Sequence, residues 1–185
     1  MRNFTALLLL LAALPAYAHS GHTEAGFVAG FVHPLTGLDH MLAMFAVGLW
    51  SATTARRVWL APLSFAATLL VGALLAQGGL ALPAVEPIVV ASVLVLGLLT
   101  MTRRRLPEFA AATLVAVFAL FHGTAHGQEL SAASALAGMV AATALLHSLG
   151  IAAGCSLASR SLRWQRAAGV GLTLAGAGLA LGLIS

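Results

Sequence analysis

The chain has 185 residues, of which 61% are hydrophobic and only 8% are charged. Soluble domains usually carry about 25% charged residues, so this composition excludes a soluble protein and indicates an integral membrane protein. The nine basic residues are all arginines and eight of them mark loops, so the formal net charge of +4 does not indicate nucleic-acid binding.

Residues 1–18 have the pattern of a secretory signal peptide. Arg2 precedes a short apolar stretch, and Ala16-Tyr17-Ala18 provides a small-x-small cleavage site. Cleavage there would leave eight arginines and five acidic residues, a net charge of +3, in a mature chain that begins at His19. The alternative is an uncleaved first transmembrane helix, but the apolar stretch is short for a span of roughly 20 residues and Pro15 interrupts it.

The predicted mature N-terminus contains His19 and His22. Together with the free amine, these imidazoles could hold a divalent metal ion loosely. Two histidines within four residues are equally compatible with a flexible polar tail, so both interpretations stay open.

Six apolar segments then predict a single all-α membrane domain over residues 19–185, with six transmembrane helices. The predicted spans are residues 27–50, 58–77, 85–101, 107–127, 131–159 and 167–184.

Arginines occur in alternate loops between these spans, namely Arg56, Arg57, Arg103, Arg104, Arg105, Arg160, Arg163 and Arg166. The loops at residues 78–84 and 128–130 contain no basic residue. The positive-inside rule therefore places the arginine loops in the cytoplasm and both mature termini outside the cytoplasmic (inner) membrane. The signal peptide predicts the same orientation, so two independent signals agree.

The first predicted span contains His33, Asp39 and His40 in the run His-Pro-Leu-Thr-Gly-Leu-Asp-His. Ionisable side chains inside a membrane span are costly, so they are candidate functional groups. In an unbroken helix the two histidines would lie about 10 Å apart, too far to share one ion. Pro34 and Gly37 predict a break in the helix, which could turn both imidazoles toward one point.

A second polar run, Phe-His-Gly-Thr-Ala-His-Gly-Gln-Glu, ends the fourth span. His122 and His126 are four residues apart and so share one helix face, with Glu129 nearly on the same face. The spacing is that of zinc proteases, but Gly123 stands where that motif needs its glutamate. The pair could also be two unrelated histidines at a helix end. The neighbouring glycines predict either close packing or a helix that unwinds.

The predicted topology places both polar runs at the external side of the membrane, together with Glu86 at the start of the third span. We therefore expect the outer ends of the first, third and fourth spans to meet around one cavity. His147 is the exception, because it lies near the middle of the fifth span. It could be a deeper relay, or a single histidine bonded to a neighbouring carbonyl.

Imidazoles and carboxylates suit borderline divalent ions such as Ni²⁺, Co²⁺ and Zn²⁺ better than Cu⁺. Cys155 is the only cysteine, which excludes a CxxC metal site, and we expect it to be a small buried residue.

The runs at residues 33–40 and 121–129 resemble the two signatures of the HupE/UreJ family of small nickel/cobalt permeases, which are linked to hydrogenase and urease maturation. The resemblance extends over nearly the whole mature chain. It implies metal-pathway roles for His33, Asp39, His40, Glu86, His122, His126 and Glu129.

This resemblance implies a secondary permease that imports Ni²⁺, with Co²⁺ as a second candidate, and that is not an enzyme. The ion would be substrate, with no permanent cofactor. Expected partners are the lipid bilayer, a second copy of the chain, and maturation proteins of a hydrogenase or urease. An intramembrane zinc-dependent hydrolase remains the alternative, because its ligand types are the same. A metal sensor or accessory subunit is a third interpretation.

Overall fold

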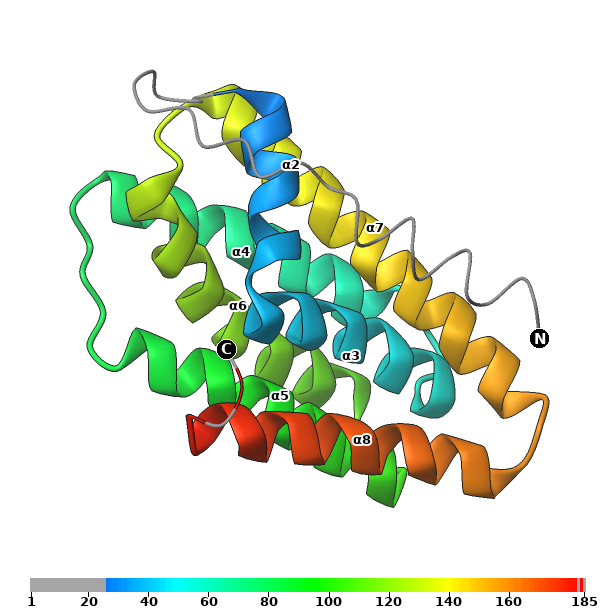
Figure 1. Cartoon of the computed structure of the whole chain (residues 1–185). Helices are drawn as coiled ribbons and strands as arrows, with labels where there is room; N and C mark the ends of the chain where they lie inside the picture. The colour runs from blue at the N-terminus through cyan, green and yellow to red at the C-terminus, as the bar shows by residue number, and fades with distance from the viewer. Residues whose placement is uncertain (1–25, 183, 185) are drawn as a thin grey trace, which may run out of the picture.

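The computed structural model describes residues 26–182 and residue 184 (Figure 1). Its described part forms seven α-helices, without a β-strand in these residues. The helices are α2 (Phe27–Thr36), α3 (Leu38–Thr54), α4 (Leu60–Gln77), α5 (Val85–Thr102), α6 (Glu108–Glu129), α7 (Ala133–Ala158) and α8 (Leu162–Ala180). The predicted signal peptide and the histidines at positions 19 and 22 lie outside the described residues.

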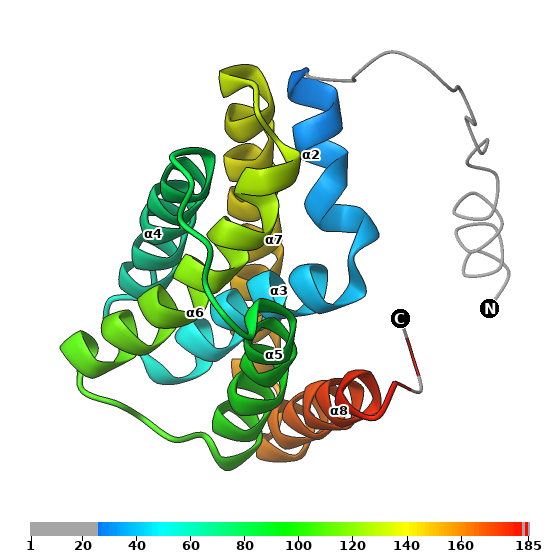
Figure 2. The ribbon, with the colours of Figure 1, turned by 90° about the vertical axis from the view of Figure 1, so that its left-hand side faces the viewer.

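The first predicted span is broken at Gly37 into the separate helices α2 and α3. Gly37 has an extended backbone (φ −86°, ψ 113°), and Pro34 lies inside the last turn of α2. Proline has no N–H for the helix ladder and glycine is a poor helix former, so this stretch is the weakest point of the span. The chain turns sharply between the two helices (Figures 1 and 2). The predicted break is confirmed.

The helices pack in pairs along the bundle: α4 lies against α6, α2 and α3 against α7, and α5 against α8. Figure 2 shows α5 and α8 side by side, and α4 next to α6. Glycines permit the closest of these approaches. A Cβ atom built on Gly123 would overlap the Leu69 carbonyl oxygen, and one on Gly127 would overlap that of Ala73. Helix α6 nevertheless continues without interruption to Glu129, so its glycines serve close packing and the helix does not unwind.

Four helices, α4, α5, α6 and α7, are long and apolar enough to cross a membrane. Helix α2 has 10 residues and is about 15 Å long, half of the roughly 30 Å hydrocarbon core. Large apolar side chains face outward, among them Phe109 (84% exposed), as expected for lipid contact. The chain is therefore a membrane protein, whereas the count of six spans stays a prediction.

Cys155 is exposed on α7, so the expectation that it is buried is wrong. The physical reason is that a small, weakly polar side chain needs no protein cover on a helix that is apolar enough to cross a membrane.

The loops that carry Arg57 and Arg104 lie together at one end of the bundle. Arg57 Nε is 3.6 Å from Glu108 Oε2, and the indole N–H of Trp50 donates to the Arg104 carbonyl at 3.1 Å. We call this the arginine end. It holds a cleft of about 480 Å³ that includes Arg56 and Arg105 in its lining.

Candidate functional site

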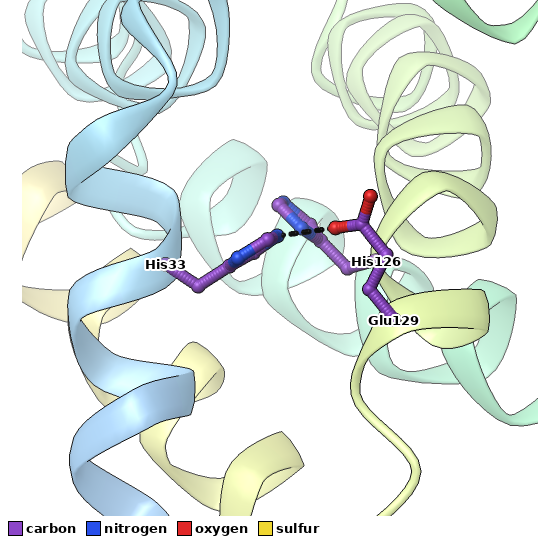
Figure 3. A group of neighbouring side chains, drawn as sticks. All are labelled: His33, His126 and Glu129. Carbon is purple, nitrogen blue, oxygen red and sulfur yellow. Dashed lines mark ion pairs between the residues drawn. The ribbon is translucent and has the colours of Figure 1, made fainter. Parts of the chain in front are cut away.

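Side chains from α2 and α6 meet at the opposite end of the bundle from the arginine end. His33, near the end of α2, directs Nε2 to Glu129 Oε2 at 2.8 Å. Its ring centroid lies 4.7 Å from that of His126, one turn earlier on α6. Figure 3 shows the three side chains pointing toward one another across the space between the two helices. One ligand atom from each of these residues lies within 4.8 Å of the other two, so the three could hold one metal ion.

His40 joins the same group from the first turn of α3. Its ring centroid is 4.3 Å from that of His126 and 4.8 Å from that of His122. The two polar runs therefore meet in one cluster, which we call the histidine cluster: His33, Asp39, His40, His122, His126 and Glu129.

The histidine cluster has an open side and a closed side. The Glu129 side chain is 62% exposed and that of His33 is 31% exposed, whereas His126 and His122 are buried at 2% and 0%. An ion that arrives from outside the bundle would meet the carboxylate first and the buried imidazoles last.

Asp39 determines which nitrogen of His40 is available to an ion. Its Oδ1 accepts the His40 backbone N–H at 2.7 Å and lies 2.8 Å from Nδ1 of the same residue. A carboxylate is acceptor-only when ionised, so Nδ1 carries the proton and Nε2 carries the lone pair. That Nε2 is buried and has no hydrogen-bond partner among the described residues. Carboxylate–imidazole pairs of this kind commonly orient metal-binding histidines.

Ser92 of α5 determines which nitrogen of His122 carries the proton. The Ser92 hydroxyl donates to the Val89 carbonyl at 2.6 Å, so its oxygen is left to accept from His122 Nε2–H at 3.0 Å. The lone pair of His122 is then on Nδ1, which is also buried without a partner in the described part of the chain. His126 likewise has a buried, unpartnered Nε2. A buried polar atom left unpaired costs about 1–3 kcal/mol, so a ligand or water that bonded to these nitrogens would be stabilised.

The glycines of α6 direct these histidines into the cluster. Gly123 and Gly127 lie one turn apart and contact the backbone of α4. His122 and His126 each precede one of these glycines and are therefore rotated by about 100° away from α4. This rotation brings them to α2 and α3.

The comparisons with known proteins agree with the motifs that meet here. A family model described as HupE / UreJ protein matches residues 7–180. The chain belongs to the HupE/UreJ family. Protein HupE of Rhizobium leguminosarum bv. viciae is 42% identical over 178 residues, which cover 92% of this chain and 93% of that protein. No solved structure matches significantly. The HupE/UreJ resemblance predicted from the two motifs is confirmed.

Glu86 is the one predicted site residue that this HupE/UreJ chain does not bring into the cluster. It lies exposed in the first turn of α5, next to Leu179 and Ala180 at the end of α8. It makes no ion pair or hydrogen bond with any described residue. Helix α5 instead reaches the cluster through Ser92, six residues further along and on a different face of the helix.

Two residues near the cluster were not predicted. Ser92 is the only polar residue in the central part of α5, and that isolation in an apolar helix was a usable signal. Phe65 of α4 lies against the buried side of the cluster, with its ring centroid 5.4 Å from that of His122. Phe65 is the one aromatic residue of α4, but an aromatic ring in an apolar helix does not by itself indicate a contact with a polar cluster.

Proposed function

We propose that this HupE/UreJ chain is a secondary permease that imports Ni²⁺, with Co²⁺ as a second ion, and that the histidine cluster is where the ion first binds. Family membership supports a permease role of this kind. The observation that carries the choice of site is the meeting of His33, His126 and Glu129, whose ligand atoms lie within 4.8 Å of one another, with the rings of His40 and His122 next to them.

The donor set favours a borderline divalent ion. The cluster offers imidazole nitrogens and carboxylate oxygens, and its described residues include no thiolate. That combination suits Ni²⁺, Co²⁺ or Zn²⁺ better than Cu⁺. In this proposal Glu129 and His33 receive the ion together with His126, the neighbouring imidazoles of His40 and His122 complete its binding, and Asp39 positions His40. The ion is substrate, and no permanent cofactor is required.

Glu86 has a separate place in the proposal, as a carboxylate that attracts cations to the entrance. It is exposed on the same side of the bundle as the loop at residues 78–84, which contains no arginine. An exposed charge acts over about 10 Å at 0.1 M ionic strength, so this role needs no direct contact with the cluster.

The membrane potential would be sufficient to drive import. The arginine loops predict that the arginine end faces the cytoplasm, which places the open side of the cluster outside, with both mature termini. Moving a divalent cation inward is then worth about 4.6 kcal/mol at 100 mV, at about 2.3 kcal/mol per charge. Because about 1.4 kcal/mol corresponds to a factor of ten, this would support more than a thousandfold accumulation. The imported ion would supply hydrogenase or urease maturation proteins.

The hydrolase alternative is not favoured by the Ser92–His122 pair. A serine nucleophile would donate its proton to the imidazole, whereas Ser92 donates to the Val89 carbonyl and accepts from His122. The hydrogen bond of this pair therefore has the direction expected when a serine positions a metal-binding imidazole, and not the direction expected of a serine nucleophile.

Ni²⁺ uptake into proteoliposomes with an imposed inside-negative potential tests the proposal. We expect His40→Ala and His126→Ala each to reduce uptake per inserted molecule at least tenfold, because each removes a ligand from a site with few donors. The control is His22→Ala, which removes an imidazole outside both motifs. Uptake by both cluster variants at the rate of the control would refute the import proposal. Nickel that survives dialysis against a chelator would instead support a resident metal and the hydrolase.

A further inference from the structure

His147 lies outside the histidine cluster, in the middle of α7 and fully enclosed by the bundle. It is the fifteenth of 26 residues of this helix, about 21 Å along its axis from the first residue. Its Nε2 is buried and has no hydrogen-bond partner among the described residues. A histidine kept only for packing would bond this nitrogen to a carbonyl, so the packing interpretation leaves the nitrogen unexplained.

A single aromatic ring connects His147 to the cluster. The Phe65 ring centroid is 5.3 Å from that of His147 and 5.4 Å from that of His122. Its ring meets that of His147 edge-on, at 88°, and no part of Phe65 is exposed. The closed side of the cluster and His147 are thus separated by one ring, which is able to change rotamer without breaking a hydrogen bond.

The surroundings of His147 contain weak donors of the kind a borderline ion accepts. Thr143 lies one turn earlier on the same face of α7 and is fully buried. Its hydroxyl is 2.9 Å from the Met139 carbonyl and 3.4 Å from the Met44 sulfur. Met44 in turn lies one turn beyond His40 on α3, so α3 and α7 together provide polar or polarisable atoms between His40 and His147.

We propose that His147 is a second, inner binding station for the transported divalent ion, separated from the histidine cluster by the Phe65 ring. The inference rests on the proposed function, since it assumes that the cluster receives the ion. An ion leaving the cluster toward the arginine end would otherwise cross an apolar layer in which Thr143 and Met44 offer only weak donors. A neutral imidazole at that depth replaces part of the water that the ion has lost. Because the imidazole carries no charge, it does not retain the ion as a carboxylate would.

The test compares His147→Leu with His147→Met. Leucine and methionine are similar in volume, so packing is nearly the same, but only methionine offers a donor atom. Radiolabelled Ni²⁺ binding to the purified protein and Ni²⁺ uptake into proteoliposomes are measured for both variants, with His126→Ala for comparison. We expect H147L to retain binding within threefold of wild type and to lose at least tenfold in uptake, and H147M to recover part of that uptake.

Three results would overturn the inner station: wild-type uptake by H147L, equal uptake by H147L and H147M, or a loss of binding in H147L as large as in His126→Ala. Failure of the proposed function gives a different pattern, because His126→Ala would then bind and transport normally whatever His147 does. Thermal melting of both His147 variants shows whether the bundle is intact, and the Leu–Met difference is unaffected by a shared loss of stability.

Discussion

Replacing Asp39 by asparagine tests whether this carboxylate acts through His40. Asp39 Oδ1 is 2.7 Å from the His40 backbone nitrogen and 2.8 Å from its Nδ1. Asparagine has nearly the same shape, but its amide can either accept from Nδ1–H or donate to a bare Nδ1. The tautomer that presents the Nε2 lone pair to the cluster is then no longer enforced.

The expected size of the effect follows from that change. Loss of an outer partner of a metal-binding histidine typically lowers metal affinity 10–100-fold, or about 1.4–2.7 kcal/mol. We therefore expect the KM for Ni²⁺ uptake to rise 10–100-fold in Asp39→Asn. The rate at saturating Ni²⁺ should stay near that of wild type, because the imidazoles that bind the ion are all retained.

The assay is the initial rate of Ni²⁺ entry into proteoliposomes at a fixed inside-negative potential, over a range of Ni²⁺ concentrations. Glu108→Gln is the matched control. It removes one carboxylate charge at the arginine end, where Glu108 lies 3.6 Å from Arg57, and leaves the cluster untouched. A KM for Asp39→Asn within twofold of this control would refute the positioning role.

Ser92→Ala should raise the same KM by a similar factor, because it removes the acceptor that fixes the His122 tautomer; an unchanged KM would mean that Ser92 serves only packing. Gly123→Ala should destabilise the α4–α6 contact by about 1–3 kcal/mol and lower the melting temperature, since its Cβ would overlap the Leu69 carbonyl, whereas Gly171→Ala has open space and should melt like wild type. Glu86→Gln should reduce uptake a few-fold at low ionic strength and by nothing measurable in high salt, because an exposed charge is screened; a loss that persists in high salt would assign Glu86 a direct contact with the ion. Mass spectrometry of the purified protein should find a chain that begins at His19, and an intact Met1 would contradict the cleaved leader.

The break in the first span was predictable because its cause is local. Pro34 and Gly37 weaken the helix wherever it packs, and the same argument gave the shared face of His122 and His126. The meeting of His122 and His126 with His33 and His40 was predicted from the depth in the membrane that the sequence assigns to these residues. That prediction used the loop charges to assign a direction to each span, and the position along the span to assign a depth.

Rotation about a helix axis could not be read from the sequence in this way. Glu86 has the depth expected of a site residue, but its side chain is exposed, and Ser92 reaches His122 in its place. Six residues advance a helix by about 600°, so these two side chains point roughly 120° apart. The packing of α5 against α8, α3 and α6 decides which of the two faces the cluster. Phe65 was not predicted because the residues around it in the sequence do not indicate which side chains of other helices it contacts.

The order of charges along the proposed path gives it a direction. Glu129 and Asp39 lie on the open side of the cluster, where water still reaches them, whereas the buried ligands proposed here, His122, His126 and His147, are imidazoles. A hydrated divalent ion needs negative charge where it first gives up water, so carboxylates belong at the entrance. A carboxylate at the depth of His147 would hold the ion in a low-dielectric layer with an attraction that the membrane potential, at about 4.6 kcal/mol per 100 mV, could not overcome. Transport requires binding strong enough to admit the ion and weak enough to release it, and neutral nitrogens in the interior meet both conditions.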